Sequence, residues 1–166
     1  MYSTDSIILS KTDQGENDAL YTLYTREYGK IRALAIGVKK ETAKLKGHLE
    51  PFTHAHVQFI LSRAGERLTS AEMRDPFSEI KENWNKIRAA AYILALIDQH
   101  AFEGEHDDLL WQLVVSELEQ LKILPGTPNE LSVFLRDFER KFLGRLGYGG
   151  EWDIRILGEG IQRPWG

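Results

Sequence analysis

The hydrophobic pattern of the chain changes its period once, at Pro76, and this change most constrains the fold. Before Pro76, apolar and polar residues alternate at every second position, which is typical of half-buried β-strands. After it, apolar residues recur every three or four positions, as on one face of an α-helix. The sequence therefore predicts an α+β protein in which strands come first and helices follow.

Five short segments before Pro76 have the composition of strands, and residues that favour turns separate them. The segments are residues 7–13, 20–25, 31–36, 55–61 and 68–73. In the fourth segment, Ala55, Val57 and Phe59 alternate with polar residues, as expected of a strand with one buried face. Because no helical pattern lies between the segments, the sequence predicts a five-stranded, strongly curved sheet or barrel.

Three helical patterns follow, at residues 84–97, 110–121 and 131–146. At the third, we expect Thr127 and Glu130 to form a capping box and Gly147 to end the helix. Because the connections are short, the helices are expected to pack as an antiparallel bundle. The predicted domains are residues 1–76 and residues 77–147, with an irregular tail at residues 148–166.

Composition excludes several kinds of site and location. The chain contains no cysteine, which removes disulfides, thiolate nucleophiles and cysteine-ligated zinc. Its longest apolar stretch, from Ala89 to Ile97, is about half of the roughly 20 residues that a membrane span requires. The N-terminus lacks the features of a secretory signal. We therefore expect a soluble protein of the cytoplasm.

Positive charge is concentrated in one short part of the chain. The basic residues of this segment are Arg26, Lys30, Arg32, Lys39, Lys40, Lys44 and Lys46. Its acidic residues are Glu27 and Glu41, so the segment has an excess of positive charge in a chain whose net charge is -4. Such a patch gains affinity for nucleic acid because the phosphates that bind it release their counterions.

Aromatic residues accompany this basic segment. Tyr24, Tyr28 and Phe52 lie on or beside the same predicted strands, where their rings are candidates for stacking on bases. A basic groove with an aromatic platform on a five-stranded barrel is a typical arrangement for binding single strands. The alternative is that the basic residues only solvate a turn and that the aromatic rings belong to the core.

The same segment resembles a known family. Residues 25–40, followed by Lys46-Gly-His-Leu-Glu-Pro-Phe52, resemble the N-terminal domain of the bacterial recombination mediator RecO, with its Ala-x-Gly step into a basic loop and its Leu-x-Pro-Phe. Upstream, Gly15-Glu-Asn-Asp18 looks like the Gly-Glu-x-Asp turn of that family. Downstream, residues 68–72 resemble its last barrel strand and residues 140–148 resemble part of its helical domain. The matches occur in the family's order over most of the chain.

The resemblance implies an OB-fold followed by a helical domain, and a role that is not enzymatic. It implies binding of single- and double-stranded DNA, annealing of complementary strands and assistance to RecA loading, with RecR and single-strand-binding protein as partners. The seven basic residues named above are the candidate DNA contacts by position. Gly29 and Gly37 stand where the backbone is expected to turn tightly or to be approached closely.

The sequence departs from the family pattern in two respects. Many RecO proteins carry four zinc-binding cysteines soon after a Leu-Gly-Tyr step, whereas no cysteine follows Leu146-Gly-Tyr148 here. We therefore expect no zinc and no other cofactor. Family members also usually extend further at the C-terminus, so the resemblance implies a short form without the last helices.

Two groups of histidines have other interpretations. His54 and His56 share one strand face at a spacing that can ligate a metal, but without a third ligand such a pair is more typical of a polar surface. His100 and His106 lie among acidic residues between two predicted helices, where a solvated connector is favoured over a cation site.

No catalytic arrangement of residues is recognisable in the sequence. Two other functions are also compatible with it. One is a protein-interaction adaptor with weak DNA binding, because the residues outside the basic segment carry an excess of negative charge. The other is an RNA-binding barrel, which uses the same stacking and charge chemistry.

Overall fold

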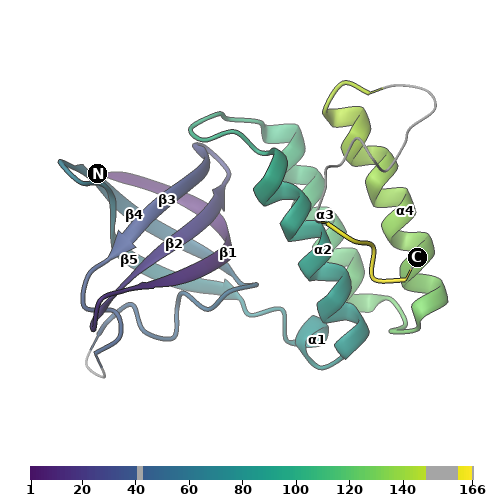
Figure 1. The fold of residues 1–166 in the computed structure, drawn as a ribbon, viewed down its shortest axis with the longest axis horizontal. Helices are drawn as coiled ribbons and strands as arrows, with labels where there is room; N and C mark the ends of the chain where they lie inside the picture. Colours follow the sequence, from purple (N-terminus) through teal and green to yellow (C-terminus); the bar gives the residue numbers. More distant parts are fainter. Residues whose placement is uncertain (41–42, 149–160, 166) are drawn as a thin grey trace. The chain divides into compact units, whose positions relative to one another are not determined.

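A computed structural model describes residues 1–40, 43–148 and 161–165. The chain forms two compact units, one made of Met1–Phe77 with Ala101–Asp107 and the other of Ser78–His100 with Asp108–Gly166. Figure 1 shows the strands gathered in the first unit and the helices in the second. The α+β class predicted from the sequence is therefore confirmed.

The first unit is a closed barrel with the strand order β1-β2-β3-β5-β4. Its strands are β1 (Tyr2–Gln14), β2 (Asp18–Thr25), β3 (Gly29–Ala35), β4 (His54–Ser62) and β5 (Gly65–Asp75). Neighbouring strands are antiparallel, except that β3 and β5 close the barrel through a short parallel contact. This is the five-stranded barrel of an OB-fold, as the strand pattern and the family resemblance predicted.

The interior of the barrel contains the apolar residues that alternate along its strands. On β4, Ala55, Val57 and Phe59 are at most 3% exposed, whereas the residues between them are partly open to solvent. Two residues of the β3–β4 loop, Val38 and Leu49, belong to the same core cluster. The loop, residues 36–53, is therefore attached to the barrel interior near both of its ends.

The described part of the second unit contains three long helices and one short one. They are α1 (Ser78–Lys81), α2 (Trp84–His100), α3 (Asp108–Ile123) and α4 (Pro128–Arg145). The three long helices confirm the three apolar patterns, whereas α1 is too short to produce a helical period in the sequence. Phe138 and Phe142 on successive turns of α4 are stacked in the core, with ring centroids 5.5 Å apart.

The two ends of α4 differ in how well the sequence predicted them. Gly147 adopts a left-handed backbone with φ 92°, and its N–H donates to the carbonyl oxygen of Gly144. Tyr148 N–H donates to Leu143, which completes the C-terminal cap expected at this glycine. The predicted capping box was wrong, because the Thr127 side chain makes no cap hydrogen bond. Proline at the start of α4, with its fixed φ, suits the first helical turn.

The domain limits predicted from the sequence remain a prediction. The loop Ala101–Asp107 connects α2 to α3 along the chain but belongs to the barrel unit. Most of the predicted tail, residues 149–160, lies outside the described residues. Among the helices that the structure describes, none is both long and apolar enough to cross a membrane.

Candidate nucleic-acid interface

The acidic loop Ala101–Asp107 is bound along the start of β3. Lys30 N–H donates to the carbonyl oxygen of Phe102 over 3.3 Å, and Gly104 N–H donates to the carbonyl oxygen of Lys30 over 3.1 Å. Glu103 also forms isolated β-bridges with Gly29 and Lys30. These main-chain contacts hold a segment with three carboxylates against the β2–β3 hairpin.

Gly29 permits this close contact because it has no side chain. Its φ is 63°, and a Cβ atom at this position would lie 2.2 Å from the carbonyl oxygen of Glu105. The carbonyl oxygen of Gly29 accepts a hydrogen bond from the Thr25 hydroxyl over 2.7 Å, and Tyr28 N–H donates to the same hydroxyl. The expectation that the backbone is closely approached at Gly29 is therefore confirmed.

The acidic loop changes the electrostatics of the first basic residues. Arg32 Nε lies 3.5 Å from Glu103 Oε1, and both side chains are more than half exposed. The ring Nδ1 of His106 lies 2.8 Å from the carbonyl oxygen of Arg26. Carboxylates beside these cations reduce the attraction that the hairpin exerts on a phosphate. Arg26, Lys30 and Arg32 are thus placed on a hairpin that an acidic segment already covers in part.

The remaining four basic residues lie beyond the other end of β3. Lys30 lies near the start of β3, which ends at Ala35. Because a strand rises by roughly 3.3 Å per residue, the two ends of β3 are well separated. The four lysines follow in the β3–β4 loop. The seven basic residues therefore form two groups rather than the single continuous surface that their closeness in the sequence suggested.

The β3–β4 loop is fixed to the barrel by polar as well as apolar contacts. Gly37 has φ 67°, and its N–H donates to the carboxylate of Asp18 over 2.7 Å. Lys39 N–H donates to the carbonyl oxygen of Asn17 over 3.0 Å. The Gly-Glu-x-Asp turn between β1 and β2 thus supports the start of the loop, which accounts for its acidic residue at position 18.

The loop lysines are not equivalent. Lys40, Lys44 and Lys46 are exposed, and none forms an ion pair within residues 1–40, 43–148 and 161–165. The Lys39 side chain is only 28% exposed, because its ammonium lies 3.4 Å from Asp13 and donates to the carbonyl oxygen of Gly15. Lys39 is therefore bound to the β1–β2 turn and is less accessible to a ligand than the other three loop lysines.

The aromatic residues predicted to stack on bases are largely occupied by other contacts. Tyr24 is 2% exposed, and burial together with the nearby Asp107 carboxylate raises its pKa. Tyr24 therefore offers no ring face to a base, which corrects the sequence prediction. Tyr28 is half-buried with its ring centroid 5.4 Å from that of Phe59. Phe52 is half-buried at a left-handed position, φ 58°.

The sequence analysis missed an aromatic residue on β1 that is open to solvent. Tyr2 is 36% exposed and stacks on Phe59 with ring centroids 5.1 Å apart. It lies near the start of β1, before the alternating pattern by which that strand was recognised. No signal in the sequence distinguished it from an unstructured terminal residue.

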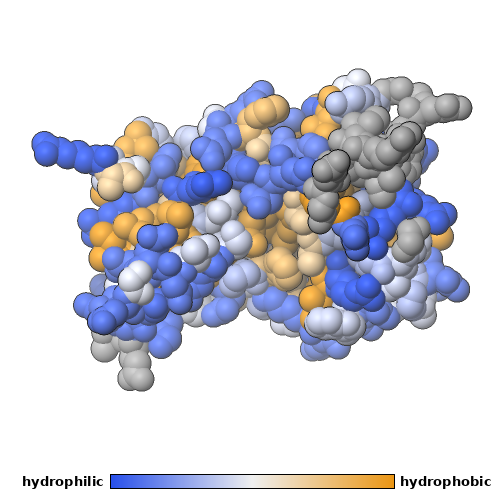
Figure 2. All heavy atoms as spheres, in the orientation of Figure 1, coloured by the Kyte–Doolittle hydropathy of each residue, from blue (hydrophilic) through white to orange (hydrophobic). Residues whose placement is uncertain are grey.

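Two hollows border the β3–β4 loop, and each adds a cation that lies outside the basic segment. One, of about 460 Å³, is lined by Lys40 and Lys44 from the loop and by Arg67 from β5. The other, of about 200 Å³, includes Lys11 from β1 beside Lys39 and Lys46. In Figure 2 the region around this loop, at the lower left of the barrel unit, is mainly hydrophilic. Burial and the nearby Glu50 and Asp13 carboxylates raise the pKa of Tyr21, in the second hollow, to about 12.

His56 on β4 makes ordinary polar contacts. His56 Nδ1 lies 2.9 Å from the Asp5 carboxylate, and His56 Nε2 lies 2.7 Å from the Ser3 hydroxyl. Among the residues that the structure describes, no three histidine or acidic side chains are grouped so that they could hold a metal ion. The contacts favour a polar strand face for His56, and His54 Nε2 lies 4.0 Å from the same Asp5 carboxylate.

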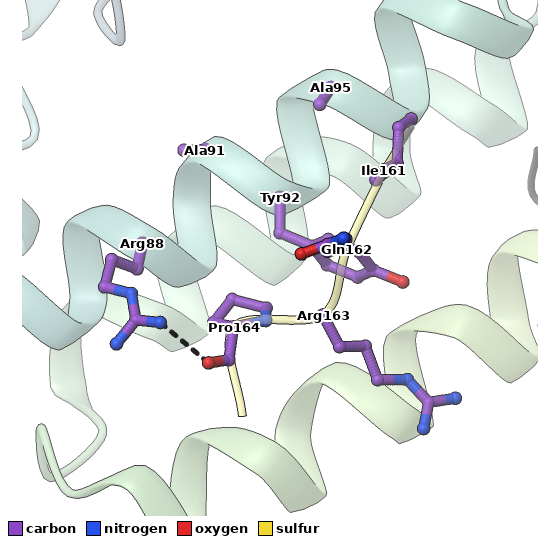
Figure 3. Close-up of a pocket in the computed structure, with 8 residues that line it drawn as sticks. All are labelled: Arg88, Ala91, Tyr92, Ala95, Ile161, Gln162, Arg163 and Pro164. Carbon is purple, nitrogen blue, oxygen red and sulfur yellow. Dashed lines mark hydrogen bonds between the residues drawn. The ribbon is translucent and has the colours of Figure 1, made fainter. Parts of the chain in front are cut away.

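A third hollow, of about 390 Å³, lies in the helical unit between α2 and the segment of residues 161–164. Figure 3 shows Arg88 of α2 reaching the carbonyl oxygen of Pro164, a hydrogen bond of 2.7 Å. The Arg88 guanidinium also lies over the Trp165 ring. Beside this hollow, Arg163 donates to both carboxylate oxygens of Glu139, which is fully buried on α4. Arg88 and Arg163 therefore both connect the segment to the helices.

Comparisons with known proteins match both units. Residues 1–77 match the family model described as Recombination protein O N terminal, and residues 81–155 match Recombination protein O C terminal. A DNA repair protein RecO from Pelotomaculum thermopropionicum is 35% identical over 150 residues, which cover 89% of this chain and 56% of the relative. Proteins of the same name from Desulforamulus reducens and Geobacter metallireducens are each 31% identical, over 89% and 87% of this chain and 56% and 58% of their own.

The chain thus spans little more than half the length of these relatives. Within that span, the two family models follow one another in the same order as the barrel and the helices. The sequence matches, the OB-fold barrel and the helical unit together show that the chain belongs to the RecO family.

Proposed function

We propose that this chain acts in DNA repair and homologous recombination as a mediator that binds single- and double-stranded DNA. The observation that carries the proposal is the β3–β4 loop, which presents Lys40, Lys44 and Lys46 to solvent from an OB-fold barrel. The names of the relatives, DNA repair protein RecO, support the same role.

The lysines act through charge and not through base recognition. An exposed ammonium group binds a phosphate of either strand and releases its counterion, so the affinity is independent of sequence. Neutralising phosphates on one strand also reduces its repulsion of a complementary strand, which favours annealing. Neither step requires a catalytic group, so the proposed role is that of a binding protein and not an enzyme.

The family resemblance supplies the partners of this proposal. RecR and single-strand-binding protein are the proposed protein partners, and RecA loading on single strands is the proposed outcome. This role places the protein in the cytoplasm with the chromosome.

The test is a fluorescence-anisotropy titration of a labelled oligodeoxythymidylate with the wild-type chain and the triple variant Lys40→Glu, Lys44→Glu, Lys46→Glu. Three lost phosphate contacts would reduce the slope of log affinity against log salt by about 2, at about 0.7 per contact. The matched control reverses three exposed cations elsewhere, Arg63, Lys81 and Arg136. A triple loop variant that binds like the control would remove the loop from the mechanism.

A protein-interaction adaptor is the second candidate, and the acidic loop Ala101–Asp107 favours it. This loop places Glu103, Glu105 and Asp107 on the barrel unit, where they oppose the approach of a polyanion. Capture of RecR or single-strand-binding protein without any DNA binding in the same preparation would favour the adaptor. Competition between DNA and RNA of equal length separates both candidates from an RNA-binding barrel.

A further inference from the structure

We infer that the groove between the β3–β4 loop and β5 holds the phosphate backbone of a single-stranded polynucleotide, with Arg67 acting together with Lys40 and Lys44. This inference rests on the proposed function and assigns its main contact surface. It adds a residue outside the basic segment and separates the loop group from the basic residues of the β2–β3 hairpin.

The groove is the first of the two hollows described beside the β3–β4 loop. It brings together three cations, two from the loop and one from β5. Its volume is about 460 Å³, and Lys40 and Lys44 line it from the loop while Arg67 lines it from β5. No acidic residue is found among the described residues that line it. Volumes of roughly 300–1,000 Å³ are typical of sites for small ligands, so the groove has room for a nucleotide unit of a longer strand.

Closure of the barrel places Arg67 beside the loop. Arg67 pairs with Leu34 in the parallel contact between β3 and β5, directly before the chain leaves β3 for the loop. The next residue, Leu68, is 3% exposed and belongs to the barrel core, so the exposed Arg67 lies on the opposite face of the strand. The guanidinium therefore extends from the outer face of the barrel at the edge of the groove.

The groove is built on a fixed support. Val38, which also lines it, is 4% exposed in the barrel core, and the Gly37 N–H is bound by the Asp18 carboxylate. Cations on a support that is already ordered lose less conformational entropy when they bind a ligand. Two apolar side chains, the half-exposed Ile36 and the partly buried Leu45, lie at the same groove and can contact bases or sugars.

The basic residues of the β2–β3 hairpin, Arg26, Lys30 and Arg32, are less suited to bind a phosphate than those of the groove. Arg32 is already paired with Glu103, and the main chain of Lys30 is bound to the acidic loop. A phosphate that approaches the hairpin must displace or tolerate the carboxylate that is paired with Arg32. Equal loss of charge in the two groups should therefore have unequal effects on binding.

The experiment compares single neutralisations in the full chain, each titrated into a labelled oligodeoxythymidylate at several salt concentrations. The key variant is Arg67→Gln, its matched control is Arg63→Gln in the exposed β4–β5 turn, and the hairpin variant is Arg32→Gln. Loss of one phosphate contact reduces the salt slope by about 0.7, which weakens binding about fivefold at about 0.1 M salt. We expect this loss for Arg67→Gln and less than a twofold change for Arg63→Gln and for Arg32→Gln.

A second variant, Lys40→Gln with Lys44→Gln, tests the groove from the loop side and does not alter β5. Circular dichroism of all variants verifies that they fold. The expected slope change of the double variant is about 1.4, twice that of one contact. If the wild-type chain binds but Arg67→Gln and the double variant behave like the Arg63→Gln control, the groove is not the contact surface, although DNA binding stands. If the loss is confined to Arg32→Gln, the hairpin is the contact surface instead. Absence of binding by the wild-type chain overturns the proposed function and the groove together.

Discussion

Replacement of Arg163 by methionine removes the arginine that binds Glu139, a carboxylate that is fully buried in the helical unit. Glu139 on α4 is 0% exposed, and its Oε1 accepts hydrogen bonds from Arg163 Nε and from the Tyr92 hydroxyl, each over 2.6 Å. Arg163 also donates to Oε2 of the same carboxylate. The paired carboxylate raises the pKa of Arg163 through hydrogen bonding and charge, so the guanidinium stays protonated at neutral pH.

The expected cost of Arg163→Met follows from what the carboxylate retains. Removing one partner of a buried ion pair typically costs about 3–5 kcal/mol, because an uncompensated charge remains. The Arg163 side chain is 17% exposed and Tyr92 still donates to Glu139, so the lower end of the range applies, about 3 kcal/mol. The double variant with Glu139→Gln removes the charge as well, and we expect it to recover about 2 kcal/mol relative to additivity.

Urea denaturation measures these free energies of unfolding, with Arg136→Met as the matched control. Arg136 is an exposed arginine on α4, the helix that carries Glu139. Its loss should change the free energy of unfolding by less than about 0.5 kcal/mol. If Arg163→Met is as stable as this control, or if the two substitutions are additive, the ion pair does not hold residues 161–165 against α4.

Three further predictions concern the barrel unit. Gly29→Ala should lower the free energy of unfolding by more than about 1 kcal/mol, because a Cβ would lie 2.2 Å from the Glu105 carbonyl oxygen at φ 63°; urea denaturation within error of the wild type would contradict this. The pKa of Tyr21 is about 12 in the folded chain against an ordinary value of 10.0, so the folded state keeps a proton that the unfolded state loses. Stability should therefore fall as the pH rises from about 10 to about 12, more steeply in the wild type than in Tyr21→Phe, as measured by denaturation at each pH. Asp18→Ala removes the acceptor of the Gly37 N–H, 2.7 Å away, and should cost about 1–2 kcal/mol and weaken oligonucleotide binding, whereas unchanged stability would show that the loop start does not depend on this bond.

The strands and helices were predictable because their signals are local. The alternation of Ala55, Val57 and Phe59 reflects one buried face of β4, and the left-handed backbone at Gly147 reflects a requirement of the helix end itself. Thr127 shows the limit of such reasoning, since the capping residue is present but its side chain makes no cap hydrogen bond. Local preference places an element but does not determine every contact at its ends.

The binding surface was less predictable because it depends on which strands meet. Tyr24 is not part of the barrel core cluster, yet it is only 2% exposed, which the alternation along β2 does not predict. Arg67 lies beside Lys40 and Lys44 because β5 pairs with β3, a contact between segments far apart in the sequence. A count of charges along the chain cannot include a cation that joins the group only when the barrel closes.

The β3–β4 loop contributes both to the packing of the barrel core and to the charged surface. Val38 and Leu49 complete the packing of the barrel interior, while Lys40, Lys44 and Lys46 between them face solvent. A small change in the volume of either apolar side chain would shift the position of every charge on the loop without altering a single charged residue. Selection for a well-filled interior therefore constrains the spacing of the phosphate contacts, and grafting this loop onto a barrel with a different interior would transfer the charges but not their arrangement.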